Sequence, residues 1–126
     1  MLDRLDEVMI YVYNHDKAID FWTTHLSFTV VEDTTEMEMR VVKLAPSEDA
    51  QTLIVLQDKA KVDAMDMGVS TATPSLIFAT TNFDSLRESL QQSGIETGEV
   101  MTLPMGRVFN FADPEQNHFA VKEVQK

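Results

Sequence analysis

The sequence predicts an α+β protein made of two paired β-α-β-β-β modules, which form a curved mixed sheet around a cleft. Segments with alternating apolar residues, which are typical of strands, are separated by turn residues. An amphipathic helix follows the first strand of each half, and the same order of elements then occurs twice. One module alone would leave a sheet face uncovered, so we expect the two modules to pair within a single domain, residues 1–126.

The first module covers about residues 1–58. Its first strand, Leu5–Tyr13, alternates and is rich in β-branched and aromatic residues. Asn14 is placed as the N-cap of a helix over residues 15–27. Apolar residues recur at helical spacing in this helix: Ala18, Ile19, Phe21, Trp22 and Leu26. Of these, Trp22 is expected in the core rather than at a dimer contact. Three further strands are predicted at Phe28–Glu32, Glu38–Leu44 and Thr52–Gln57.

The second module covers about residues 74–126, after a linker of about residues 59–73 that is predicted to be a loop with room for a helical turn. Pro74–Thr81 is the first strand of this module. Asn82 is again placed as an N-cap, before a helix that ends at Gly94. The remaining strands are predicted at Glu96–Thr102, Arg107–Ala112 and His118–Glu123.

Composition and charge limit the classes of function. The chain has no cysteine, which excludes disulfides, thiolate catalysis and thiolate-bound metals. The formal charge of -11 argues against binding to nucleic acid or an anionic membrane, but it permits a cationic ligand. No apolar run is long enough to span a bilayer, and "MLDRLDEVMIY" lacks the pattern of a signal peptide. We therefore expect a cytoplasmic protein.

Two short motifs, together with the repeated order of elements, resemble those of a known protein superfamily. The stretches "FWTTHLSF" (Phe21–Phe28) and "FADPEQN" (Phe111–Asn117), within paired modules, resemble the vicinal oxygen chelate superfamily. That group includes glyoxalase I, extradiol dioxygenases, and fosfomycin- and bleomycin-resistance proteins. Ser27 and Gln116 stand where the family motifs have glycine. Because glycine at such turns supplies positive φ, we expect a different turn or mild strain at both positions. The resemblance also implies a homodimer.

In members that use a divalent metal, the resemblance implies one ligand from the first and one from the last strand of each module. These positions fall on Glu7, Val55, Ser75 and Ala120. Glu7 is a suitable ligand, Ser75 is a poor one, and the other two have no donor atom. The sequence therefore predicts neither a metal nor a cofactor.

Strand alternation suggests a different pair of polar residues. His118 shares a face with Ala120, which is expected to point toward the cleft, and Glu7 is expected on the cleft side of its own strand. Glu7 and His118 could form a general acid/base couple. The alternative is a solvated histidine after a turn and a carboxylate at the cleft rim. Ser75 with His118 is a weaker nucleophile–base pair, because no orienting acid is recognisable.

Other residues are assigned more simply. His15 and His25 are expected at the surface, and Arg40 and Arg107 could each pair with Glu7 or with an anionic ligand group. Methionine suits adaptable ligand surfaces as well as irregular cores. Met9 shares the cleft face with Glu7 and Tyr11, whereas alternation does not fix where the other methionines point: Met37, Met39, Met65, Met67, Met101 and Met105.

Three hypotheses of function remain open. The first is a metal-free binding protein for a small, cationic or aromatic molecule, with the ligand-binding residues Glu7, Met9, Tyr11, Ser75 and His118. The second is a glyoxalase-like lyase or isomerase with a non-standard site that uses Glu7 and His118. The third is a structural or regulatory role with a vestigial cleft. An ordered pocket with convergent polar groups would favour the first two, and a cleft filled by its own side chains would favour the third.

Overall fold

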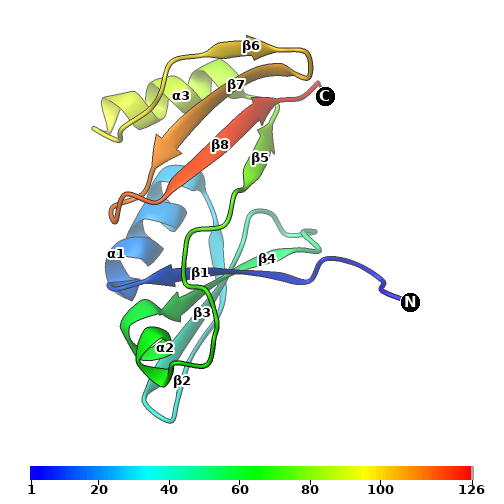
Figure 1. The fold of residues 1–126 in the computed structure, drawn as a ribbon. Helices are drawn as coiled ribbons and strands as arrows, with labels where there is room; N and C mark the ends of the chain where they lie inside the picture. Colours follow the sequence, from blue (N-terminus) through cyan, green and yellow to red (C-terminus); the bar gives the residue numbers. More distant parts are fainter. Residues whose placement is uncertain (126) are drawn as a thin grey trace. The chain divides into compact units, whose positions relative to one another are not determined.

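The chain folds into two compact units, residues 1–74 and residues 75–126, and each contains one four-stranded mixed sheet. The computed structural model describes residues 1–125 (Figure 1). The predicted α+β class and the repeated β-α-β-β-β order are confirmed. The strands form two separate sheets, and the expected cleft shared by the two modules stays a prediction. Within residues 1–125, no helix is both long and apolar enough to cross a membrane.

The first unit has a sheet with the strand order β1-β4-β3-β2, in which β1 runs parallel to β4 and the other neighbours are antiparallel. Its elements are β1 (Glu7–Val12), α1 (His15–Asp20), the π-helical turn η1 (Phe21–His25), β2 (Thr29–Glu36), β3 (Met39–Ala45), β4 (Leu53–Asp58) and α2 (Lys59–Met65). The helix α1 and its π-helical continuation supply buried residues to one sheet face. Most of this core comes from Ala18, Phe21, Trp22, Ile10, Val12, Val42, Leu44, Ile54 and Leu56.

The first helix begins as predicted and ends differently. The side chain of Asn14 accepts a hydrogen bond from the Lys17 amide at 3.0 Å, which confirms it as the N-cap. After Asp20 the chain widens into the π-helical turn, where the Thr23 hydroxyl donates to the Ile19 carbonyl at 2.7 Å. The wider turn places Trp22 in the core, where its side chain is 0% exposed, as predicted.

Two segments of the first unit carry more structure than predicted. The strand β2 extends to Glu36 instead of ending at Glu32. The linker contains the helix α2, whose N-cap Asp58 accepts a hydrogen bond from the Lys61 amide at 3.0 Å. An Asp followed by "KAKVDAM" is a capped helix sequence, but its few apolar residues do not give the periodicity that would reveal it.

The second unit has a sheet with the strand order β5-β8-β7-β6. Its elements are β5 (Ile77–Thr80), α3 (Phe83–Gln92), β6 (Met101–Leu103), β7 (Gly106–Ala112) and β8 (His118–Glu123). The core is rich in aromatic residues and includes Phe83, Leu90, Phe109, Phe111, Phe119 and Val121. Asn82 holds the N-cap position of α3, but its side chain makes no capping hydrogen bond.

The sixth strand is shorter than predicted. Of the expected segment Glu96–Thr102, only its last two residues belong to β6, which continues to Leu103. Earlier in this segment, Thr97 forms an isolated bridge with Phe111, and the Gly98 amide donates to the Asn110 carbonyl at 2.7 Å. The segment therefore follows β7 closely without forming a regular strand.

Both positions where glycine was expected keep the left-handed conformation. Ser27 has a φ of 59° and Gln116 a φ of 64°. The second turn is held by Asp113, whose carboxylate accepts hydrogen bonds from the amides of Glu115 and Asn117 at 2.9 and 2.8 Å. The turns are therefore retained, and each holds an L-residue in a region that disfavours it.

We expect the variants Ser27→Gly and Gln116→Gly each to raise the free energy of unfolding by about 0.5–1 kcal/mol, because relief of the left-handed strain exceeds the extra entropy of an unfolded glycine. Urea unfolding followed by far-UV circular dichroism measures this change. Gly94→Ala is the control, and it should lower the free energy of unfolding. Gly94 has a φ of 77°, and an added Cβ would meet no atom within 4 Å, so only backbone strain would act. A loss of stability in both glycine variants would contradict the assignment of strain.

Candidate functional site

The candidate site lies on the face of the first unit's sheet that is opposite to the α1 core face; we call it the site face. Residues paired across neighbouring strands project to the same side of a sheet, so the register assigns its members. Tyr11 pairs with Gln57. Met9 pairs with Val55, which in turn pairs with Lys43. The predicted grouping of Glu7, Met9 and Tyr11 on one face follows from the alternation of β1.

The helix α2 lies against β1 and β4 and takes part in a pocket of about 310 Å³ on this face. We call it the methionine pocket; it is lined by Met9, Tyr11, Met39, Gln57, Val62, Met65, Met67 and Val69. Four of these eight residues are methionines. Tyr11 and Gln57 bring polar groups, and the amide of Gln57 donates to the sulfur of Met9 at 3.5 Å.

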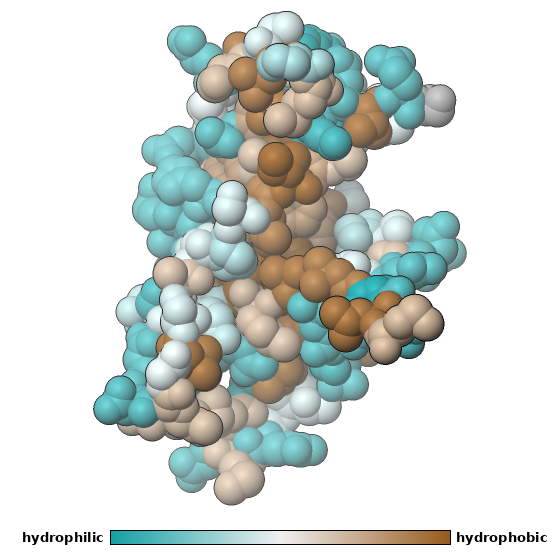
Figure 2. All heavy atoms as spheres, turned by 45° about the vertical axis from the view of Figure 1, so that its right-hand side comes forward, coloured by the Kyte–Doolittle hydropathy of each residue, from teal (hydrophilic) through white to brown (hydrophobic). Residues whose placement is uncertain are grey.

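The chemistry of the pocket is apolar and adaptable. Thioether side chains are unbranched and polarizable, so they fit flat or irregular apolar molecules. The side of the pocket formed by α2 and the segment after it is open to solvent, since Met65 is 51% and Met67 is 69% exposed. Figure 2 shows that apolar side chains lie among hydrophilic ones on one face of the molecule. The volume lies at the lower end of the range for ligand pockets, about 300–1,000 Å³.

Sequence reasoning found two of the pocket residues and missed the rest. Met9 and Tyr11 were predicted on this face, whereas Met39, Met65 and Met67 had no assigned direction. The alternation of β4 was a usable signal for Gln57, because it shares parity with Val55. No comparable signal existed for the residues on α2, since the helix itself was not predicted.

A group of charged residues stands beside the pocket on the site face. The Lys43 ammonium lies 2.8 Å from the Glu7 carboxylate and 3.9 Å from that of Glu32. Its hydrogen bond to Glu7 raises the pKa of Lys43 above the ordinary value, so the ammonium stays protonated at neutral pH. Glu7 is therefore engaged by a cation of this chain.

The residues at the four implied ligand positions do not fit a divalent metal. Glu7 is engaged by Lys43, and Val55, which is 1% exposed, has no donor atom. Ser75 is an exposed residue before β5, and Ala120 lies in β8. Within residues 1–125, no group of three or more His, Asp or Glu side chains could hold a metal ion. Tight binding of a first-row metal requires several such donors.

The remaining predicted site residues lie in the second unit. His118 is exposed at the first position of β8, and the alternation with buried Phe119 and Val121 agrees with the predicted parity. Glu7 belongs to the first unit. The Glu7–His118 couple and the pairing of Ser75 with His118 both stay predictions.

One of the simpler assignments, that of His15, is corrected. His15 is 8% exposed rather than at the surface, and its Nε2 has no hydrogen-bond partner among the described residues. It was misjudged because the first residue of a helix is usually solvated, whereas here it packs into the core. His25 is half-buried, and its ring centroid lies 6.0 Å from that of Phe21.

The two strand arginines bind carboxylates of their own units instead of Glu7. Arg40 donates to Asp16 and to Asp33, each at 2.8 Å, and the bond to Asp33 holds the pKa of that carboxyl below its ordinary value. In the second unit, Arg107 donates to Asp84 and Glu123 at 2.9 and 2.7 Å. Both arginines connect the first turn of a helix to the sheet, which is a structural role.

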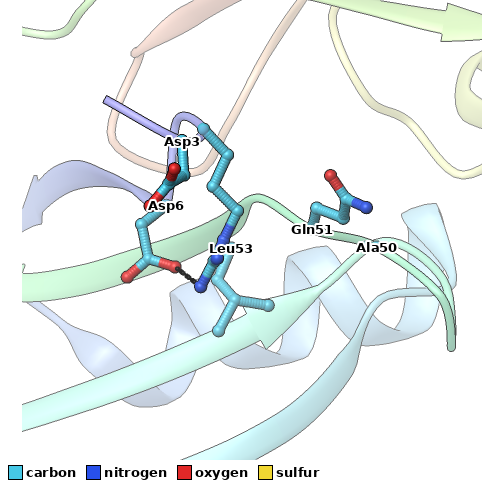
Figure 3. A pocket seen from close by; sticks show the side chains of 6 residues that line it. Asp3, Asp6, Ala50, Gln51 and Leu53 are labelled. Atoms are coloured by element: carbon cyan, nitrogen blue, oxygen red, sulfur yellow. Dashed lines mark hydrogen bonds and ion pairs between the residues drawn. The ribbon is translucent and has the colours of Figure 1, made fainter. Parts of the chain in front are cut away.

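A second hollow, of about 560 Å³, lies beside the N-terminal segment and the start of β4 (Figure 3). Asp3, Arg4, Asp6, Ala50, Gln51 and Leu53 line it. Arg4 and Asp6 pair at 3.1 Å, but both side chains are more than half exposed, so the pair is well solvated and contributes little. Because this hollow combines few apolar groups with a solvated ion pair, we place the candidate site in the methionine pocket.

Comparison with known proteins agrees with this fold. The "Uncharacterized protein YetH" of Bacillus subtilis (strain 168) is 28% identical over 125 residues, which cover 98% of this chain and 100% of that protein. TnmS3, an antibiotic binding protein from Streptomyces sp. CB03234, superimposes with a TM-score of 0.80 at 24% identity, over 97% of this chain and 96% of that one. A superfamily member from Sphaerobacter thermophilus DSM 20745 gives a TM-score of 0.81 at 24% identity, over 98% of both chains.

The family itself is identified by its sequence profile. The profile of the Glyoxalase/Bleomycin resistance protein/Dioxygenase superfamily matches residues 4–121, which is nearly the whole chain. This match agrees with the resemblance of the two motifs and with the duplicated β-α-β-β-β order. The chain belongs to the Glyoxalase/Bleomycin resistance protein/Dioxygenase superfamily.

Proposed function

We propose that this protein binds a small aromatic or apolar molecule in the methionine pocket, without a metal. The observation that carries the proposal is the pocket itself, which is lined by four methionines and two valines together with Tyr11 and Gln57. Such a lining holds a flat apolar body by dispersion, while the two polar groups orient it. The antibiotic-binding activity of TnmS3, a protein of similar fold, is compatible with this role.

The charge of the chain favours a neutral or cationic ligand over an anionic one. The net charge is -11, and the group beside the pocket contains two carboxylates, Glu7 and Glu32, for one ammonium, Lys43. A ligand that carries an amine is therefore attracted to this face. We also propose a homodimer in the cytoplasm, and size-exclusion chromatography with light scattering tests the oligomeric state.

The lyase or isomerase hypothesis has less support. It requires Glu7 to accept or donate a proton together with His118. The ammonium of Lys43 lies 2.8 Å from Glu7 and occupies one of its carboxylate oxygens. An ammonium in contact with this carboxylate competes with a substrate for the position that a general acid or base needs.

The binding proposal is tested with 1-aminoanthracene, a flat aromatic amine whose fluorescence rises in an apolar site. We expect saturable binding to the wild type, and a loss of affinity of about tenfold or more in Val62→Asp, because a charge would be buried in the pocket lining. Displacement of the dye by a panel of aromatic compounds would then define the ligand class.

Ala60→Asp is the matched control for this variant. Ala60 lies on the same helix α2, is exposed and does not line the pocket. It should bind the dye like the wild type, and circular dichroism confirms that both variants fold. Unchanged affinity in Val62→Asp, or an equal loss in Ala60→Asp, would contradict the assignment of the pocket.

A further inference from the structure

Lys43 is an unusual residue for its place in the sheet. It lies in the middle of β3 between Val42 and Leu44, which are both fully buried on the core face. Its own side chain projects to the site face, where it is 27% exposed. The carboxylates that it meets come from two other strands, Glu7 from β1 and Glu32 from β2. The sheet therefore brings one cation to a position between two anions.

One of these anions has a special place in the family resemblance, since Glu7 stands at the first implied metal-ligand position. We propose that the ammonium of Lys43 is a built-in cation, which takes the place of a divalent metal at Glu7. The proposal concerns the charged end of the site face and does not rest on ligand binding in the methionine pocket.

The contacts explain why a metal and Lys43 exclude each other. The ammonium lies 2.8 Å from the Glu7 carboxylate, whereas a first-row metal ion bound to that carboxylate would lie at about 2.0–2.2 Å, so the two cations would be close neighbours. A divalent ion placed beside it would meet strong repulsion between like charges. Val55 lies next to Lys43 in the register, and it offers a buried methyl surface where the resemblance implies a second donor. The site is thus closed to a metal by charge and by the lack of donors.

The charge balance predicts what happens when Lys43 is removed. Two carboxylates and one ammonium leave a formal charge of -1 on this group. Without the ammonium the charge becomes -2, and two carboxylates with water suffice for weak binding of a hard divalent ion. Such an ion should therefore bind where the ammonium was. In the wild type, a ligand group that reaches Glu7 meets the singly charged ammonium of Lys43, which is an N–H donor, and not a divalent ion.

The test compares Mn²⁺ binding to the wild type and to Lys43→Met, measured by electron paramagnetic resonance and isothermal titration calorimetry. We expect Lys43→Met to bind one Mn²⁺ per chain at least about tenfold more tightly than the wild type. The double variant Glu7→Gln/Lys43→Met should lose this gain, because it removes one of the two carboxylates.

Lys122→Met is the matched control, since it removes an equal charge from a half-buried strand lysine of the second unit. It corrects for the general effect of a more negative protein. Lys43→Gln replaces Lys43→Met if the methionine variant does not fold.

The proposal is overturned if the wild type binds one Mn²⁺ per chain in a manner that Glu7→Gln abolishes. It is also overturned if removal of Lys43 increases Mn²⁺ binding no more than Lys122→Met does. Failure of dye binding in the methionine pocket would affect the proposed function alone.

Discussion

Replacement of Trp22 by alanine is expected to lower the free energy of unfolding of the first unit by about 3–5 kcal/mol, the usual cost of truncating a buried aromatic residue. The side chain is 0% exposed, and its ring lies edge-on to Phe21 and Phe28 at centroid distances of 5.6 and 5.0 Å. The truncation removes both aromatic contacts and leaves a cavity beneath the π-helical turn. Because this loss is comparable to the total stability of many small domains, the first unit should be largely unfolded at 37 °C.

Urea unfolding of this variant must be followed by far-UV circular dichroism, because Trp22 is the only tryptophan and its fluorescence is lost. Tyr13→Ala is a suitable control: it also truncates an aromatic residue, but Tyr13 is 65% exposed. It should change stability by about 1 kcal/mol or less. If Trp22→Ala lowered the free energy of unfolding as little as Tyr13→Ala does, the prediction would be contradicted, and the π-helical turn would tolerate the cavity.

His15→Phe is expected to stabilise the protein by about 1–2 kcal/mol, because the buried Nε2 of His15 has no hydrogen-bond partner among the described residues. In the second unit, the corresponding helix position holds a phenylalanine. Phe83 is the first residue of α3, as His15 is of α1, and it is 2% exposed. The guanidinium of Arg107 lies 4.6 Å from the Phe83 ring centroid.

The surroundings of the two positions correspond closely. In each unit the next helical residue is an aspartate, Asp16 or Asp84, that binds the strand arginine of its own sheet. The reciprocal variant Phe83→His should therefore destabilise the second unit by a similar amount, through an unsatisfied imidazole. Urea unfolding of both variants at pH 8 checks the pair of predictions. A loss of stability in His15→Phe would show that the space in the first unit is shaped for imidazole.

These stability variants are separate from the site. Trp22 contributes to the core face of the first sheet, whereas the methionine pocket and Lys43 belong to the opposite face. Stability and ligand binding can therefore be changed independently. A variant that loses dye binding and keeps its unfolding free energy reports on the site alone.

The sequence by itself determined the architecture of each module. Local signals decide where elements begin and end, and they are strong here: Asn14 caps α1, and the last strand has the predicted bounds His118–Glu123. Alternation placed Met9 and Tyr11 on one face of β1, and helical spacing placed Trp22 in the core. These features depend on residues close in the chain, so a single sequence is sufficient to infer them.

Only the tertiary structure decided the composition of the site. Glu7 and Lys43 are distant in sequence, and they meet because β4 lies between β1 and β3 in the sheet. No local pattern specifies that strand order or the packing of α2 on the site face. The same reason explains why His15 was expected at the surface, since burial depends on what packs over a residue. The periodicity of the sequence indicates on which face of a strand or helix a side chain lies. The contacts of that side chain depend on elements that are distant in the sequence.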